Sequence, residues 1–269
     1  MTSPLERLGT ATASGARCVF LSPHLDDAVL SCGALMRALA PRSEIHVVTV
    51  FTATTDGPHT RAARSFLRQC GHGDATDGST LFAARREEDR VVLDGLGVSH
   101  EHLGLPDALF RRRAVPRALA GPAARVARVL PELVHRYPTF RYDIALGRVS
   151  RGDRALGAAL AARLEARLAG ADLVFAPLGV GRHVDHLLTR TLGAGHPGRV
   201  VYYSDFPYDQ SHARDEDFLR RHGLRAWRHD EGPEGRAAKA DLIRGYATQA
   251  DALFPSGVIP AAPETYFAA

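Results

Sequence analysis

One short stretch limits the possible folds of this chain more than any other: an apolar run that ends abruptly in a polar turn. Residues 18–21 are apolar, residues 22–27 read Ser-Pro-His-Leu-Asp-Asp, and a helix-like apolar pattern resumes over 28–39. An apolar run that breaks at a proline and continues as a helical pattern is typical of a strand, a turn and a helix. Because open α/β sheets place their active sites at such turns, we expect a functional site around His24.

The order of strand and helix signals predicts an α/β protein. Apolar runs rich in β-branched residues alternate with amphipathic stretches, which indicates a mostly parallel sheet covered by helices on both faces. With 269 residues, 45% of them hydrophobic, the chain can form a large core, and we expect one domain over 1–269 with a flexible tail at 1–15. Strands are predicted near residues 17–21, 44–52, 101–105, 172–176 and 199–203. Helices are predicted near 27–39, 81–96, 157–168, 185–192 and 235–250, and near 117–137 with interruptions at 121–122 and 131.

Two long segments carry no clear periodic pattern. Residues 54–80 are rich in Thr, Gly, Asp and His, with one expected helical turn at 65–70, and residues 206–235 are similarly irregular. A long segment of this kind inside a compact domain is more often a binding loop or lid than a strand. We therefore expect both segments to line the pocket, and an irregular tail after residue 250.

The basic composition does not indicate a nucleic-acid partner. The formal charge is +4, and Lys239 is the only lysine, so almost all positive charge comes from arginine. No arginine run is interleaved with aromatic residues, as a nucleic-acid surface would require. Arg111, Arg112 and Arg113 are expected to form a solvated face, with a substrate phosphate or carboxylate as the alternative contact. Residues 151–153, Arg-Gly-Asp, are expected to form a turn.

The cysteines and the apolar runs indicate a cytoplasmic protein. Cys18, Cys32 and Cys70 are odd in number and lack CxxC spacing, which argues against a disulfide framework and against a thiolate zinc site. No apolar run approaches the ~18 residues of a membrane span, and no signal-peptide pattern is present. The expected partner is a small molecule, and a homo-oligomer is compatible with the sequence.

A second motif, His-Val-Asp-His at residues 183–186, follows another predicted buried strand and a glycine-rich turn. Residues three apart on a helix share a face, so both imidazoles can point into one pocket. An HxxH pattern alone is a weak signal. Because this one follows a strand as the first motif does, the two can converge on one site.

Together the two motifs predict a metal centre with its own base. His24, Asp27 and His186 form a two-histidine, one-carboxylate set that suits a catalytic zinc, although Fe²⁺ accepts the same ligands. A bound metal lowers the pKa of its water towards about 7, and the neighbouring Asp26 is the natural base. We expect His183 to stabilise the oxyanion and to protonate the departing amine. Asp185 is expected to orient one of the two imidazoles.

The two motifs, taken together, resemble those of a known protein family. Pro-His-Leu-Asp-Asp at 23–27 with His-Val-Asp-His at 183–186 resembles the PIG-L or LmbE-like superfamily, which is related to N-acetylglucosaminyl-phosphatidylinositol deacetylase. The similarity runs from about residue 17 to 203. The resemblance implies a Rossmann-like three-layer α/β fold and a zinc-dependent N-deacetylase acting on acetylated amino sugars. By this resemblance His24, Asp27 and His186 match the metal ligands and Asp26 matches the general base. His183 matches the histidine that stabilises the tetrahedral intermediate.

Two further residues enter the prediction through this resemblance alone. Arg85, in the segment Arg-Arg-Glu-Glu at 85–88, matches an arginine-rich segment of the family and is the expected substrate contact. Asp107 matches an acidic residue that holds sugar hydroxyls in some members. The alternatives are a solvated charge at the start of a helix for Arg85 and an ordinary turn residue for Asp107.

The chain also departs from the family pattern. Leu25 stands where the family usually has proline, and Ala28 and Val29 stand where acidic residues are common. Neither change removes a ligand, but both separate the chain from the mycothiol and glycolipid enzymes. The identity of the substrate therefore cannot be inferred from those enzymes.

The sequence thus predicts a metal-dependent hydrolase that removes an N-acetyl or other N-acyl group from an amino sugar or related amine. A secondary-metabolite or sugar-conjugate pathway fits this activity. The alternatives are a metal hydrolase of a non-sugar amide or of a phosphoester, and a sugar-binding protein on a retired catalytic scaffold. A phosphatase would need a two-metal cluster with more carboxylates than these motifs supply.

Overall fold

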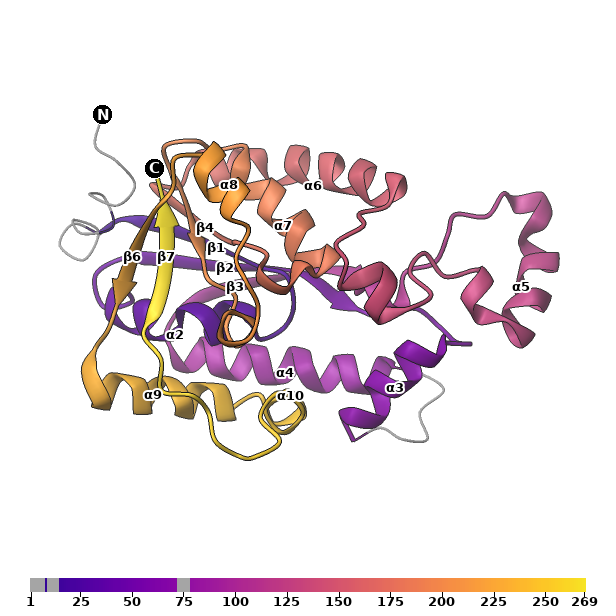
Figure 1. Ribbon diagram of the computed structural model, residues 1–269, viewed down its shortest axis with the longest axis horizontal. Coiled ribbons are helices and arrows are strands. Elements are labelled where there is room, and N and C mark those ends of the chain that lie inside the picture. The colour runs from indigo at the N-terminus through magenta and orange to yellow at the C-terminus, as the bar shows by residue number, and fades with distance from the viewer. Residues whose placement is uncertain (1–7, 9–14, 72–77) are drawn as a thin grey trace.

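A single mixed sheet organises the part of the chain that the computed structural model describes, residue 8 and residues 15–71 and 78–269 (Figure 1). Its strands are β1 (Arg17–Ser22), β2 (Glu44–Ala53), β3 (Ser99–Pro106), β4 (Leu173–Pro177), β5 (Val200–Tyr203), β6 (Arg225–His229) and β7 (Glu264–Ala268). They lie in the order β3-β2-β1-β4-β5-β7-β6. β1 to β5 pair in parallel, and β7 pairs antiparallel with β5 and β6. The predicted mostly parallel sheet is confirmed.

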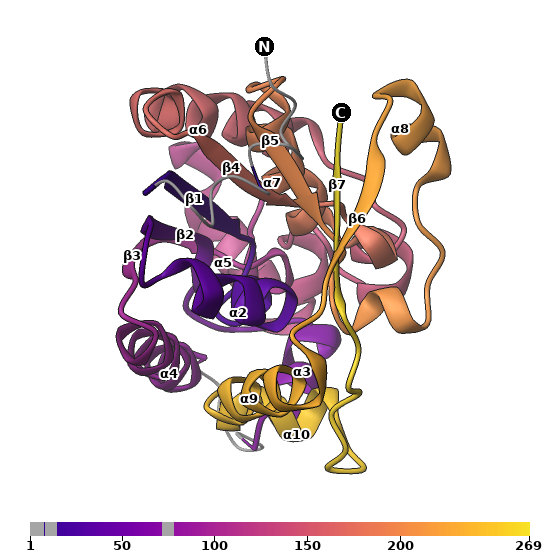
Figure 2. The same cartoon turned by 90° about the vertical axis from the view of Figure 1, so that its left-hand side faces the viewer.

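Helices cover both faces of the sheet, as the alternation of elements predicts. They are α2 (Asp27–Leu39), α3 (Arg61–Gln69), α4 (Ser79–Gly95), α5 (Ala120–Val129), α6 (Arg151–Ala169), α7 (Val184–Ala194), α8 (Glu216–Arg221), α9 (Gly232–Arg244) and α10 (Ala247–Leu253). Figure 2 shows α6 and α7 on one side of the sheet and α2, α4 and α9 on the other. The predicted three-layer sandwich is therefore confirmed.

The alternation of side chains along β1 builds two cores, one on each face of the sheet. Cys18 and Phe20 pack into the core beneath α2, α4 and α9. Val19 and Leu21 pack into the opposite core, beneath α6, α7 and α8. Because β1 is buried on both faces, it reads in the sequence as a continuous apolar run.

The position of β1 in the sheet determines where a site can form. The chain winds outward from β1 to β2 and β3 on one side, and then returns to place β4 and β5 on the other side. At such a reversal of strand order, the loops after the two central strands diverge and leave a crevice at their carboxyl ends. The two predicted motifs directly follow β1 and β4, so both lie at this crevice.

The second half of the chain contains more regular structure than the sequence indicates. Residues 206–235 hold α8 and β6, the expected final helix is two helices, α9 and α10, and the expected irregular tail ends in the buried strand β7. The expected helical turn at 65–70 is the full helix α3. The prediction of a flexible tail at 1–15 falls, apart from residues 8 and 15, outside the described residues.

The Arg-Gly-Asp segment was predicted wrongly as a turn. Residues 151–153 open α6, where the hydroxyl of Ser150 accepts the backbone N–H of Asp153 at 3.1 Å. This contact is an N-terminal cap, which a serine three residues before an acidic residue commonly provides.

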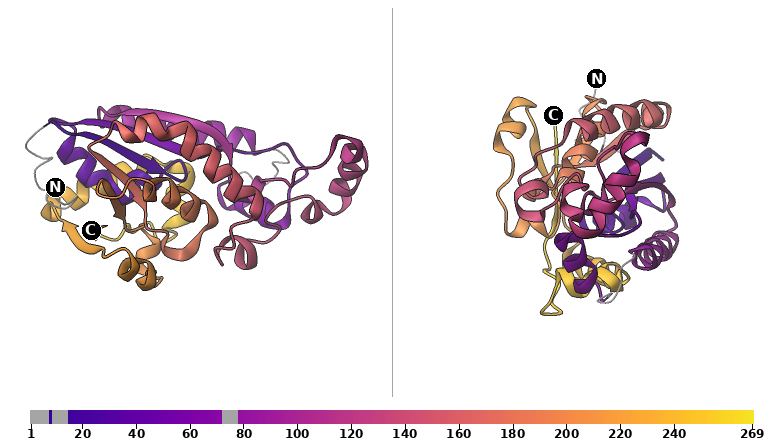
Figure 3. Two further views of the ribbon diagram at one scale, coloured as in Figure 1. Left: turned by 90° about the horizontal axis from the view of Figure 1, so that it is seen from above. Right: turned by 90° about the vertical axis from the view of Figure 1, so that its right-hand side faces the viewer.

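The chain between β3 and α6, residues 107–150, forms an arm that extends from the body of the molecule. It contains α5 and lies at one end of the molecule, away from the sheet (Figures 1 and 3). Several of its large apolar side chains are exposed, including Leu119, Val129 and Leu133. Among the described residues, no helix combines the length and the apolar character that crossing a bilayer demands.

Candidate active site

The turn after β1 is held in place by its own polar groups. The Ser22 hydroxyl donates to the carbonyl of His24 at 2.6 Å and accepts the backbone N–H of Ala28 at 3.0 Å. The backbone N–H of Phe51, on β2, donates to the carbonyl of Pro23 at 2.9 Å. The turn is therefore tied both to α2 and to the neighbouring strand, which presents His24 rigidly at the crevice.

The three predicted metal ligands converge. One ligand atom from each of His24, Asp27 and His186 lies within 4.8 Å of the other two, and all three residues are buried. Oδ2 of Asp27 is 3.1 Å from Nδ1 of His24 and 3.3 Å from Nε2 of His186. Burial alone would raise the pKa of Asp27, but the two imidazoles outweigh it and hold the pKa below its usual range. The carboxylate is thus kept ionised, as a metal ligand must be.

The ring of His186 is oriented by Asp205, a residue that the sequence prediction did not single out. Nδ1 of His186 lies 2.7 Å from Oδ1 of Asp205. The other oxygen, Oδ2, accepts the backbone N–H groups of Gly179 and Val180, each at 2.8 Å. Asp205 therefore joins the loop after β5 to the loop after β4 and leaves Nε2 of His186 facing Asp27. A carboxylate behind a ligating histidine is the usual arrangement at metal centres.

The carboxylate of Asp185 contacts the ring of His24, from the other motif, rather than the ring of His183 or of His186. Oδ2 of Asp185 lies 3.1 Å from Nε2 of His24 and accepts the backbone N–H of Ala108 at 2.9 Å. Oδ2 of Asp107 lies 3.4 Å from the same ring nitrogen. Two carboxylates thus face Nε2 of His24, so that Nδ1 is directed towards Asp27.

Asp26 points into the cavity and does not cap α2. It occupies the N-cap position, yet its side chain makes no capping hydrogen bond. Oδ2 of Asp26 lies 3.6 Å from the guanidinium of Arg85, which is itself 3% exposed. Burial, followed by the nearby charge of Asp27, raises the pKa of Asp26 to about 6. A buried carboxyl group with a pKa near neutrality suits a general base.

His183 is held in one orientation by the start of α7. Its Nδ1 accepts the backbone N–H of Asp185 at 3.2 Å, so the neutral ring carries its proton on Nε2. Burial, together with the neighbouring rings of His24 and His186, holds the pKa of His183 well below its ordinary value. The neutral ring can therefore offer one N–H to a ligand, on the side away from the helix.

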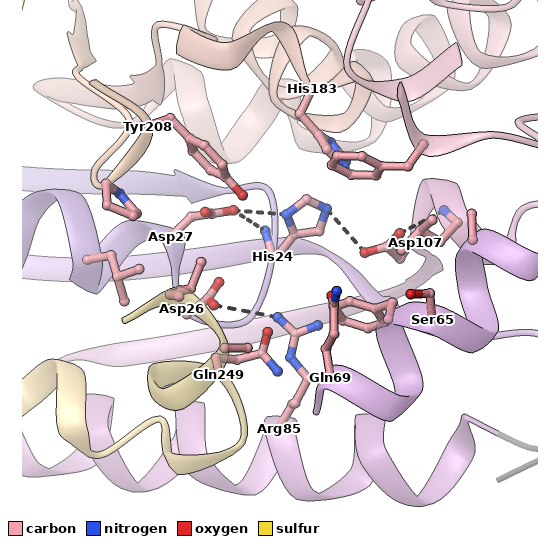
Figure 4. A pocket seen from close by; sticks show the side chains of 18 residues that line it. His24, Asp26, Asp27, Ser65, Gln69, Arg85, Asp107, His183, Tyr208 and Gln249 are labelled. Carbon is pink, nitrogen blue, oxygen red and sulfur yellow. Dashed lines mark hydrogen bonds and ion pairs between the residues drawn. The ribbon is translucent and has the colours of Figure 1, made fainter. Parts of the chain in front are cut away.

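Several of these groups line one cavity of about 460 Å³, and Asp185, His186 and Asp205 lie buried outside its lining (Figure 4). One part of its wall is polar and holds His24, Asp26, Asp27, Arg85, Asp107 and His183. The rest is mainly apolar and comes from α3, α10, Leu30, Leu109, Phe140 and the segment at 207–208. Both irregular segments of the sequence therefore contribute to the pocket, as predicted. Arg85 and Asp107 line the same cavity, and their expected contact with a substrate stays a prediction.

Arg111 is buried, which corrects the expectation of a solvated arginine face. Its guanidinium lies between Asp185 and Asp153 and is 2.9 Å from the latter, and the residue is 4% exposed. Burial lowers the pKa of Arg111. Tyr137 donates its hydroxyl to Asp153 at 2.5 Å. This buried network links the base of the arm to the carboxylate that orients His24.

Two curated proteins are similar in sequence to this chain. A 2'-N-acetylparomamine deacetylase from Streptomyces fradiae is 32% identical over 200 residues, which are 71% of this chain and 57% of that protein. The match thus spans little more than half the length of that relative. A 2'-N-acetylparomamine deacetylase from Niallia circulans is 28% identical over 93% of this chain and 89% of its own.

Solved structures share the fold. A deacetylase of the teicoplanin biosynthesis pathway, solved as a bog complex, superposes with a TM-score of 0.69 at 24% identity and covers 94% of this chain and 97% of its own. The family described as PIG-L: GlcNAc-PI de-N-acetylase matches residues 19–195, about two thirds of the chain and both motifs. The resemblance drawn from the motifs is therefore confirmed, and the chain belongs to the PIG-L family.

Proposed function

We propose that this chain is a metal-dependent N-deacetylase of an acetylated amino-sugar conjugate in a secondary-metabolite pathway. One observation carries the proposal: His24 and Asp27, which converge with the buried His186, line the same cavity as a carboxylate and an imidazole outside this ligand set, those of Asp26 and His183. Family membership supports the reaction type. Both curated relatives are named for the deacetylation of an amino sugar, which supports the substrate class.

The donor set fits Zn²⁺. Nδ1 of His24, a carboxylate oxygen of Asp27 and Nε2 of His186 would hold the ion, since two imidazoles and one carboxylate are common ligands of catalytic zinc. Fe²⁺ accepts the same ligands. When bound, such a metal supplies Lewis-acid activation of a water and of the amide carbonyl. The contact between Asp205 and Nδ1 of His186 supports the assignment, because it leaves Nε2 of His186 available to the metal.

The remaining groups divide the proton transfers between them. Asp26 accepts a proton from the attacking water, and its raised pKa allows it to return that proton to the leaving nitrogen. The Nε2–H group of His183 donates a hydrogen bond to the oxyanion. We assign the proton for nitrogen to Asp26 rather than to His183, because Nδ1 of His183 is already engaged by the N–H of Asp185.

Acetate release from simple N-acetylglucosaminides tests the proposal. The zinc-loaded protein is expected to release acetate, and His186→Ala is expected to lose both the bound metal and the activity. Asp209→Asn, which alters a carboxylate next in sequence to the cavity-lining Tyr208 and outside the ligand set, is the matched control and should keep both. If the protein holds one metal ion and releases no acetate from any member of the panel, the substrate class is wrong. If it binds no metal, the assignment of the centre is wrong.

A further inference from the structure

Gln249, in the first turn of α10, is a buried polar residue of the cavity wall that has no part in the proton transfers described above. It lines the cavity and is 5% exposed. Its amide nitrogen donates to the backbone carbonyl of Thr248 at 3.0 Å and to the sulfur of Cys70 at 3.5 Å. Because a carbonyl can only accept a hydrogen bond, the NH2 group is the part of the amide that faces Thr248. The carbonyl oxygen of the amide, Oε1, is thereby turned away from these partners.

This oxygen lacks a hydrogen-bond donor within the protein. Among the residues that the structure describes, every hydrogen bond of the Gln249 side chain is made by its nitrogen. A buried acceptor without a donor is costly unless water or a ligand supplies one. Figure 4 shows Gln249, Arg85 and Asp26 on the same side of the pocket. The unpaired oxygen therefore lies where a bound substrate can provide the missing donor.

Two carboxylates of α4 fix the position of this part of the chain. Glu88 accepts the backbone N–H of Thr248 at 3.0 Å and its hydroxyl at 2.7 Å. The neighbouring Asp89 accepts the hydroxyl of Tyr246 at 2.8 Å. Both carboxylates lie one helical turn after Arg85, and residues three or four apart share a face of a helix. The start of α10 is thus held against the turn of α4 that carries Arg85.

The groups beside Gln249 indicate which kind of donor fits there. Arg85 is 3% exposed, lines the same cavity and offers only N–H donors. A hydroxyl group can donate to Oε1 of Gln249 and at the same time accept from the guanidinium. An ammonium group can do only the first, and a carbonyl or carboxylate only the second. The pair of Arg85 and Gln249 is therefore complementary to a neutral hydroxyl.

The position of the base limits which hydroxyl of an amino sugar can reach this pair. Asp26 lies 3.6 Å from the guanidinium of Arg85, so the acetamide that Asp26 acts on is close to the pair as well. The nearest sugar oxygens are then those on the two carbons next to the one that bears the acetamide. The anomeric oxygen carries the aglycone and has no proton to donate. The 3-hydroxyl is free and can do both.

We infer that Gln249 is a specificity-determining residue whose Oε1 accepts a hydrogen bond from the 3-hydroxyl of the amino sugar, and that Glu88 positions it. The inference rests on the proposed function and adds a residue to the substrate-binding part of the same site. A site built to bind a hydroxyl rejects an analogue that lacks it, because the buried partner is then left unpaired.

Phenyl N-acetylglucosaminide and its 3-deoxy analogue test the role of Gln249. For the zinc-loaded protein, kcat/KM is expected to be about 10-fold or more higher for the hydroxylated glycoside. Gln249→Met keeps the approximate size of the side chain and removes the acceptor, so the preference should fall to about twofold or less. The fall should come from the hydroxylated glycoside alone, since the deoxy analogue has no hydrogen bond to lose. Gln210→Met, at an exposed position outside the cavity lining, is the control and should keep the full preference.

Variants of Glu88 test how Gln249 is positioned. Glu88→Ala releases Thr248 and should lower the preference for the hydroxylated glycoside several-fold. Glu88→Gln retains an oxygen that can accept the N–H of Thr248 and should recover most of the preference. Glu87→Ala, which removes the neighbouring exposed carboxylate paired with Arg90, is the matched control and should change nothing. An unchanged preference in Glu88→Ala overturns the positioning role.

The outcomes separate this inference from the proposed reaction. Equal kcat/KM for the two glycosides, or a full preference in Gln249→Met, overturns the inference and leaves the deacetylase assignment intact. An equal loss for both glycosides in Gln249→Met also overturns it, because a residue that supports the fold or contacts the acetamide behaves in that way. If neither glycoside is hydrolysed, calorimetric binding to the zinc-loaded protein decides. Tighter binding of the hydroxylated glycoside, with the difference lost in Gln249→Met, supports the inference, whereas equal binding or no binding overturns it.

Discussion

Nδ1 of His186 lies 2.7 Å from Oδ1 of Asp205, and this contact decides which nitrogen of the imidazole faces Asp27. We therefore expect Asp205→Ala to lower zinc affinity by about 10- to 100-fold, the usual cost of losing a carboxylate behind a ligating histidine. Competition with a chelator measures the affinity. Asp209→Ala, four residues away, is the control and should bind zinc normally. Unchanged affinity in Asp205→Ala would mean that α7 alone orients the ring.

Replacing the proposed base should slow turnover without removing the metal. Asp26→Asn keeps the size of the side chain but cannot accept a proton, so kcat should fall by about 10²- to 10⁴-fold. Metal content, measured on the same sample, should stay at the level of the unmodified protein, because Asp26 is outside the ligand set. Near-normal turnover by metal-loaded Asp26→Asn protein would remove Asp26 from the mechanism. Asp251→Asn, an exposed carboxylate on α10 outside the cavity lining, is the matched control and should keep normal turnover.

Most of the site could be predicted because its residues follow strands at recognisable turns. The ligands and the base lie within five residues of the end of β1 or in the first turn of α7, where short motifs are visible. Asp205 could not be predicted, because its partner His186 is 19 residues away and only the pairing of β4 with β5 brings them together. The signal that could have found it is positional, an acidic residue just beyond the β5 run.

The wrong predictions for Arg111 and for the C-terminal strand β7 also arise from contacts between residues that are distant in the sequence. Arg111 belongs to a run of three arginines, which is typical of a solvated face, and only the buried carboxylates of Asp153 and Asp185 show otherwise. β7 contains Glu264, which reads as exposed in the sequence. In the fold that carboxylate accepts the N–H groups of Ala34 and Leu35 and pairs with Lys239 at 3.0 Å. The burial of both side chains could not be predicted, because the charged partners of each are distant in the sequence.

The Arg111 network is expected to support stability as well as the site. Arg111→Met keeps much of the apolar stem but leaves the carboxylates of Asp153 and Asp185 without their buried cation, so the free energy of unfolding should fall by about 3–5 kcal/mol. Urea denaturation of the metal-free protein measures this change. Arg117→Met, an exposed position on the same arm, is the control and should change stability by less than about 0.5 kcal/mol. A similar small change in Arg111→Met would show that the network is not stabilising.

The three thiols are expected to be unreactive while the protein is folded. Cys18, Cys32 and Cys70 are buried and form no disulfide. Burial, with a smaller effect from Asp172, raises the pKa of Cys18 to about 12, and burial raises the pKa of Cys32 well above its ordinary value. A thiol with a pKa near 12 is about 10⁻⁴ thiolate at pH 8, against roughly a quarter for a free cysteine, so alkylation by iodoacetamide should be about 10³-fold slower. Mass spectrometry of the native and guanidinium-unfolded protein compares the rates.

Because only the thiolate reacts, the native rate at Cys18 should rise about tenfold for each pH unit as long as the fold persists. Rapid labelling of Cys18 at pH 8 would show instead that β1 becomes exposed through local opening.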